Sequence, residues 1–129
     1  MSGTYSYNKN EKLKSRKMLN QLFAEGKSFS VFPVKVFFLP MHFANNRPIN
    51  AGVGVSARNF KKAVDRNRIK RLLRECYRLN KLLLQSTKTN NHQPMAVFFL
   101  YIGKDMPDYT ILNEKMKAVL NKLEEIIVR

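Results

Sequence analysis

At 129 residues and a formal charge of +15, the chain is long enough to bury one core and too short for several domains. Its single cysteine, Cys76, excludes an internal disulfide, and no apolar run reaches the roughly 20 residues of a membrane span. Self-repulsion among so many cations favours a polyanionic partner, and we expect a cytoplasmic protein with no membrane association and no small-molecule substrate.

The N-terminal part of the chain is predicted to contain a tail, a helix and two short strands. Residues 1–10 are polar and lack periodicity, so we expect a mobile tail followed by a single domain over residues 11–129. A helix is predicted over Ser15–Glu25, where apolar residues recur at helical spacing. Residues Phe29–Leu39 have strand composition, but Pro33 cannot occupy a central ladder position and predicts two short pieces.

Two more strands and a final helix complete the predicted order. The strands cover Ile49–Ser56, which has small residues on one face, and Met95–Ile102. Polar loops are predicted over two segments, Met41–Pro48 and Gln85–Gln93. The last helix starts near Pro107 and Asp108 and runs to about Arg129, and its nearly balanced charges are typical of a packing helix.

The segment from Lys61 to about Leu84 is predicted to be a helix with one cationic and one apolar side. Between Lys61 and Lys81 it carries nine basic residues against two acidic ones. At roughly 100° per residue, the cationic side holds two adjoining ridges: Arg66, Lys70 and Arg74 on one, Asn67 and Arg71 on the other. The opposite side is apolar: Ile69, Leu72, Leu73, Cys76 and Leu79.

Like charges four residues apart destabilise a helix, whereas a surface helix normally alternates Glu with Lys at that spacing. The line of Arg66, Lys70 and Arg74 therefore predicts a phosphate backbone lying along it, and arginine suits this role because its guanidinium binds phosphate in a bidentate manner. The alternative is a solvated basic face. Because the excess charge is concentrated here, we predict binding to structured RNA.

The same helix carries a long motif. The run Ala63–Glu75, AVDRNRIKRLLRE, resembles the signature of the protein component of bacterial ribonuclease P. The strand Gly52–Ser56 upstream is similar to that family as well, and the resemblance extends from about Lys12 to the C-terminus. It implies an α+β fold, in which a small mixed sheet is flanked by helices in the order α-β-β-(β)-α-β-α. A left-handed β-α-β crossover is also implied, as in the second domain of a small-subunit ribosomal protein.

The resemblance implies an accessory subunit that assists RNA-catalysed removal of the 5′ leader from precursor tRNA. The implied partners are the catalytic RNA and precursor tRNA. Cleavage, and the Mg²⁺ that it requires, would belong to the RNA, so no catalytic or metal-binding residue and no cofactor are expected on the chain. The residues expected to contact RNA are mostly basic: Arg58, Lys61, Lys62, Arg66, Asn67, Arg68, Lys70, Arg71 and Arg74.

A cleft for the single-stranded leader is also implied, between the first helix and one face of the sheet. Its expected residues are Phe23, Phe37, Leu19, Gly54, Lys14 and Arg16. Aromatic faces under unstacked bases suit a leader of variable sequence, although an aromatic residue on a strand can equally belong to the core. Leu19 stands where the family often has a second aromatic residue. The turn between Ser56 and Arg66 is one residue longer than the family pattern and lacks its usual glycine.

Other function classes find little support. One alternative is a ribosomal or chaperone-like RNA-binding module without a catalytic partner, and another is an autonomous nuclease. The chain offers no nucleophile with a base and no acidic metal cluster, and His42 and His92 lie in predicted loops. The run Gly52–Ala57 fits a dinucleotide-binding pattern only formally, because its glycines lie within the predicted strand.

Overall fold

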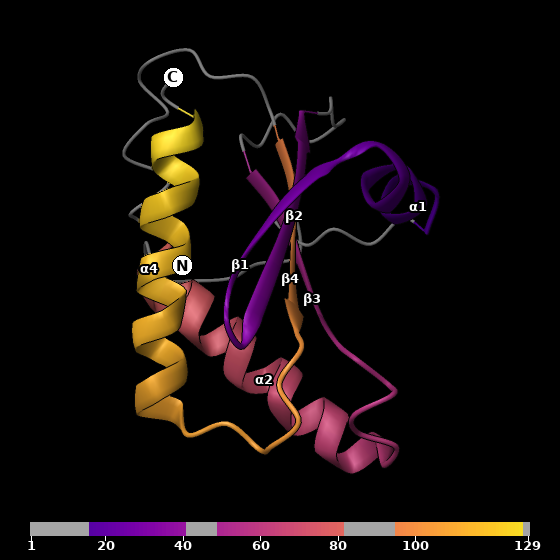
Figure 1. Ribbon diagram of the computed structural model, residues 1–129, viewed down its shortest axis with the longest axis vertical. Helices are drawn as coiled ribbons and strands as arrows, with labels where there is room; N and C mark the ends of the chain where they lie inside the picture. The colour runs from indigo at the N-terminus through magenta and orange to yellow at the C-terminus, as the bar shows by residue number, and fades with distance from the viewer. Residues whose placement is uncertain (1–15, 41–48, 82–94, 128–129) are drawn as a thin grey trace, which may run out of the picture.

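The computed structural model describes residues 16–40, 49–81 and 95–127. The predicted tail, the two predicted polar loops and Lys14 lie outside these ranges. The described residues form three helices and four strands (Figure 1): α1 Arg16–Glu25, β1 Lys27–Val31, β2 Val34–Pro40, β3 Ile49–Val55, α2 Ala63–Asn80, β4 Met95–Tyr101 and α4 Tyr109–Ile127. None of these helices is both long and apolar enough to cross a membrane.

The four strands form one mixed sheet in the order β1-β2-β4-β3. β1 and β2 form an antiparallel hairpin that turns at Phe32–Pro33, whose peptide bond is cis, so the break predicted at Pro33 is confirmed. β2 pairs antiparallel with β4, and β3 pairs parallel with β4. Because parallel neighbours need a crossover, α2 joins β3 to β4. The α+β class and the order of elements are confirmed, while the left hand of the crossover stays a prediction.

Side-chain alternation divides the sheet into two faces, and α4 and α1 lie on opposite sides of it (Figure 1). The face toward α2 and α4 carries the main core, because every second strand residue is apolar there. Its fully buried members include Val36, Val97 and Phe99 of the strands, Ile69 and Leu73 of α2, and Met116, Leu120 and Leu123 of α4.

The other sheet face carries a smaller core under α1. Leu22 of α1 and Ala96 of β4 are fully buried, with Met18, Leu19, Phe37, Leu39 and Phe98 packed around them. Only α1 contacts this face among the described helices, so several of its strand side chains remain half-buried. This partly open face is where the predicted leader cleft would lie.

The bounds of α2 differ from the predicted helix of Lys61 to Leu84. The helix starts at Ala63 because Phe60 is buried against the core, which keeps the chain extended up to the N-cap Lys62. It ends at Asn80, with Lys81 as C-cap. The buried residues of α2 are Ile69, Leu73, Cys76 and Tyr77, so the apolar side is confirmed for three predicted members, and Tyr77 was missed.

Candidate nucleic-acid interface

The solvent-facing side of α2 is cationic along most of its length. Arg68, Arg71 and Arg74 are exposed, as is Asn67, and Lys70 is half-buried. Arg78 pairs with Glu75 and Lys117 with Glu114, whereas none of Arg68, Lys70, Arg71 and Arg74 forms an ion pair with another described residue. We call these four residues the cationic face of α2.

The core sets the direction of the cationic face. Ile69, Leu73 and Cys76 have no exposed surface, and at about 100° per residue they lie within a narrow arc of the helix. Lys70 lies beside this arc, whereas Arg71 lies almost opposite Ile69. Because the buried residues hold α2 against the sheet, the basic side chains project outward from a rigid element, as phosphate binding requires.

Arg66 differs from the rest of the predicted ridge. Its Nη1 donates hydrogen bonds to the carbonyl oxygens of Phe60 and Lys61, at 2.8 and 2.7 Å. It is half-buried and forms no ion pair with any other described residue. Arg66 therefore uses part of its guanidinium to hold the segment that precedes α2 in position.

Side-chain contacts hold the turn between β3 and α2, which is one residue longer than the family pattern. The Asn59 side-chain amide donates to the carbonyl oxygens of Ile102 and Gly103, both at 3.2 Å, and the Phe60 ring packs 6.0 Å from that of Tyr101. These contacts, with those of Arg66, fix the turn without its usual glycine. Arg58, Lys61 and Lys62 on it are exposed, so they extend the positive charge beyond the start of α2.

The far end of α2 is neutralised and packed. The hydrogen bond from Arg78, with an N to O distance of 2.6 Å, lowers the pKa of Glu75. Burial raises the pKa of the Cys76 thiol to about 11, which makes it a poor nucleophile. Asn80 donates to the side-chain oxygen of Asn113 on α4 at 2.7 Å. The free positive charge of the helix is thus concentrated between Arg66 and Arg74.

Three aromatic rings meet between α1 and the open sheet face. The Phe23 ring of α1 lies edge-on to those of Phe37 and Phe98, each with a centroid distance of 5.1 Å. Phe23 keeps 46% of its surface exposed, and the Lys35 Nζ lies 5.1 Å from the centroid of the Phe37 ring. We call Phe23, Phe37 and Phe98 the aromatic cleft, after the leader cleft that was predicted at this place.

The other predicted cleft residues that the structure describes lie on the same side of the sheet. Leu19 packs in the α1 core, Arg16 is exposed at the start of α1, and Gly54 faces Phe98 across β3 and β4. A β-carbon at Gly54 would lie 2.6 Å from Phe98 Cζ, so only glycine leaves room for this ring as it stands. Phe98 and Lys35 were missed as cleft residues, although strand alternation puts them on one face with Phe37.

A family model described as Ribonuclease P matches residues 7–124. The ribonuclease P protein component of Porphyromonas gingivalis is 32% identical over 120 residues, covering 93% of this chain and 88% of that protein. The corresponding protein of Chlorobium phaeobacteroides is 29% identical and covers 95% of this chain and 92% of its own length.

The chain belongs to the ribonuclease P protein family. It is the protein subunit of the ribonuclease P holoenzyme, which processes tRNA, and this role is favoured over an RNA-binding module without a catalytic partner. The ribonuclease P protein from Thermotoga maritima superposes with a TM-score of 0.68 at 24% identity, covering 87% of this chain and 96% of that chain. This likeness shows that the two proteins share a fold.

Gly54 offers a test of the cleft geometry in this ribonuclease P protein. We expect Gly54→Ala to lower the free energy of unfolding by about 1–3 kcal/mol, because the new methyl group must displace the Phe98 ring from its contact with Phe23. Urea unfolding measures the loss. Gly54→Ala combined with Phe98→Leu should recover part of it, and an equal loss in the single and double variants would show that Phe98 is not the obstacle.

Proposed function

We propose that the chain assists RNA-catalysed removal of the 5′ leader from precursor tRNA by means of two separate surfaces. The cationic face of α2, with the basic turn before it, binds the catalytic RNA, and the aromatic cleft binds the leader. The RNA carries the catalytic site and holds the Mg²⁺ that it needs. We also infer that the assembly works in the cytoplasm.

The observation that carries this proposal is the cationic face itself. Four basic side chains project from one rigid helix, and none is neutralised by another described residue, although like charges at this spacing oppose helix stability. Lys61 and Lys62 add cations at the positive end of the α2 dipole, where anions are favoured. A phosphate backbone would satisfy both features, and it supplies the counterion release that dominates affinity for nucleic acid.

The aromatic cleft supports leader binding because its chemistry suits single strands. Phe23 offers a half-exposed ring at the edge of the cleft, and Lys35 brings a cation to the same face. Stacking of a base on an aromatic ring contributes about 1–3 kcal/mol and depends little on sequence, which is what a leader of variable sequence needs. The cleft and the cationic face lie on opposite sides of the sheet core, with the start of α2 beyond the end of β3, so the two RNA segments need not compete.

The experiment that tests the proposal is a cleavage assay on precursor tRNA. The protein is assayed with and without the catalytic RNA encoded in the same genome, at low Mg²⁺. We expect no cleavage by the protein alone, slow cleavage by the RNA alone and faster cleavage by the two together. Cleavage by the protein alone would place the active site on the chain, and an unchanged RNA rate would contradict the accessory role.

Substitution of Phe23 should separate leader binding from tRNA binding. We expect Phe23→Ala to weaken binding of precursor tRNA to the holoenzyme by about fivefold or more, because one stacking surface is lost, and to leave mature tRNA unaffected. Filter binding of both substrates measures the difference, and Phe23→Tyr should restore the preference. Equal weakening for precursor and mature tRNA would argue for a folding role of this ring instead.

A further inference from the structure

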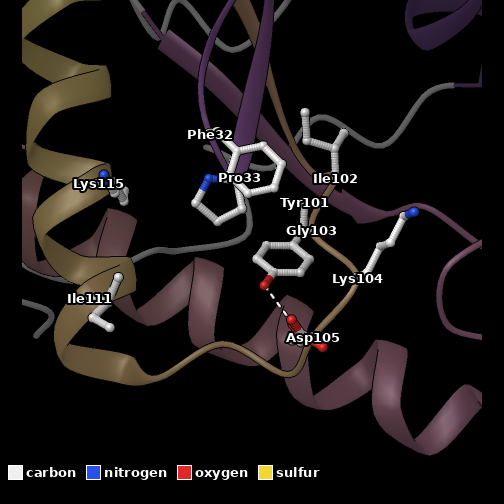
Figure 2. A pocket seen from close by; sticks show the side chains of 9 residues that line it. All are labelled: Phe32, Pro33, Tyr101, Ile102, Gly103, Lys104, Asp105, Ile111 and Lys115. Carbon is white, nitrogen blue, oxygen red and sulfur yellow. Dashed lines mark hydrogen bonds between the residues drawn. The ribbon is translucent and has the colours of Figure 1, made fainter.

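A separate pocket of about 480 Å³ lies at the end of the molecule where the β1–β2 hairpin turns (Figure 2). Its walls come from three segments: the hairpin turn at Phe32 and Pro33, the end of β4 with the residues after it, and the first turns of α4. The volume falls within the ~300–1,000 Å³ typical of pockets for small ligands. Tyr101, which lines it, belongs to the sheet face covered by α2 and α4, so this pocket is distinct from the aromatic cleft.

The apolar walls of the pocket include two large side chains that are mostly exposed and not packed in the core. Phe32 is 66% exposed, and Ile111 of α4 is 58% exposed on the other wall. Figure 2 shows the ring of Phe32 beside that of Pro33 above Tyr101, whose hydroxyl donates to the Asp105 carbonyl oxygen at 2.6 Å. This hydrogen bond holds the floor of the pocket in place, so the exposed ring of Phe32 faces a preformed site.

The rim of the pocket is cationic. Lys104 and Lys115 line it from opposite sides (Figure 2), against one carboxylate, that of Asp105. Neither lysine forms an ion pair with a residue in 16–40, 49–81 or 95–127. The combination of an exposed aromatic ring with flanking ammonium groups suits a nucleobase and its phosphates, whereas a purely apolar partner would leave both charges unmatched.

The pocket is also linked by hydrogen bonds to the basic turn before α2. The Asn59 amide donates to the carbonyl oxygens of Ile102 and Gly103, so the strand end that lines the pocket is tied directly to the turn that carries Arg58 and Lys61. An RNA bound along the start of α2 would therefore pass close to this end of the molecule.

We propose that this pocket binds a single unpaired nucleotide of the RNA that lies along α2. The base stacks on Phe32 between Pro33 and Ile111, and its flanking phosphates lie near Lys104 and Lys115. The site rests on the proposed function, since it requires an RNA on the cationic face, but it adds an anchoring point outside both α2 and the aromatic cleft.

A tryptophan at the pocket tests this directly, because the chain contains none. Phe32→Trp places the only indole at the proposed stacking position, and Met106→Trp, at a residue that is 38% exposed and outside the pocket lining, serves as control. On titration with the transcribed catalytic RNA, we expect strong quenching of the Phe32→Trp emission and little change in the control. Equal quenching of both, or none in a saturated complex, would overturn the site.

The affinity of Phe32 variants for the catalytic RNA provides a second test of the pocket. Phe32→Ala should weaken binding to the same RNA by about fivefold or more, Phe32→Tyr should restore it, and thermal unfolding should be unchanged because the ring is exposed. If the wild-type chain binds the RNA and Phe32→Ala binds it equally well, the pocket proposal fails while the proposed function stands. If the wild-type chain does not bind the RNA, the proposed function fails, and the pocket proposal, which rests on it, fails as well. A change in sedimentation without a change in RNA affinity would identify the pocket as a contact between copies of the chain, and would overturn nucleotide binding.

Discussion

Replacing Arg71 and Arg74 by alanine is expected to lower affinity for the catalytic RNA by about thirtyfold at ~0.15 M salt. Each phosphate contact contributes about 0.9 to the slope of log affinity against log salt, so the loss of two contacts should reduce the steepness of that slope by about 2. Both side chains are exposed, so stability should change by no more than about 0.5 kcal/mol. Filter binding over a series of salt concentrations gives both quantities.

The matched control removes the same charge from another helix. Lys117 and Lys122 of α4 are exposed, and Lys117 is already paired with Glu114 at 3.6 Å. Alanine at both positions should leave the salt slope unchanged and reduce the affinity by less than about threefold, because long-range attraction is screened beyond a Debye length of about 8 Å. Equal losses in the two double variants would mean that net charge, and no particular face, governs binding.

The second large effect is expected on the buried side of the same helix. Leu73 has no exposed surface and lies in the main core, so Leu73→Ala should lower the free energy of unfolding by about 3 kcal/mol, within the usual range of 2–5 for such a cavity. Urea unfolding monitored by circular dichroism measures the loss. Arg74→Ala, at the next residue, should change stability little. A loss below about 1 kcal/mol for Leu73→Ala would show that this side of α2 does not anchor the helix.

The two-sided character of α2 was predictable because it depends on local periodicity. Apolar residues at helical spacing place Ile69, Leu73 and Cys76 on one side whatever the rest of the fold does, and the structure confirms them as buried. Tyr77 was missed because tyrosine occurs on both the buried and the exposed side of helices. Its burial becomes clear only from the structure, where its ring centroid lies 5.4 Å from that of Phe99.

What the sequence could not predict depends on contacts between distant segments. The wheel places Arg66 on the ridge with Lys70, but it cannot show that burial of Phe60 turns two carbonyl oxygens toward that guanidinium. Likewise, alternation puts Phe98 and Phe37 on the same sheet face, but which face is left partly open becomes clear only when α1 is seen to cover it. The pocket at Phe32 is assembled from three separate segments and has no periodic signature.

RNA bound on the cationic face of α2 should protect the arginines of this face from chemical modification. The free chain and its saturated complex with the catalytic RNA are treated with phenylglyoxal, and modification is located by mass spectrometry. Arg68, Arg71 and Arg74 should lose reactivity in the complex, whereas Arg16, which is exposed at the start of α1 and predicted to contact the leader, should keep it until precursor tRNA is added. Undiminished reactivity of Arg68, Arg71 and Arg74 in a saturated complex would contradict the assignment.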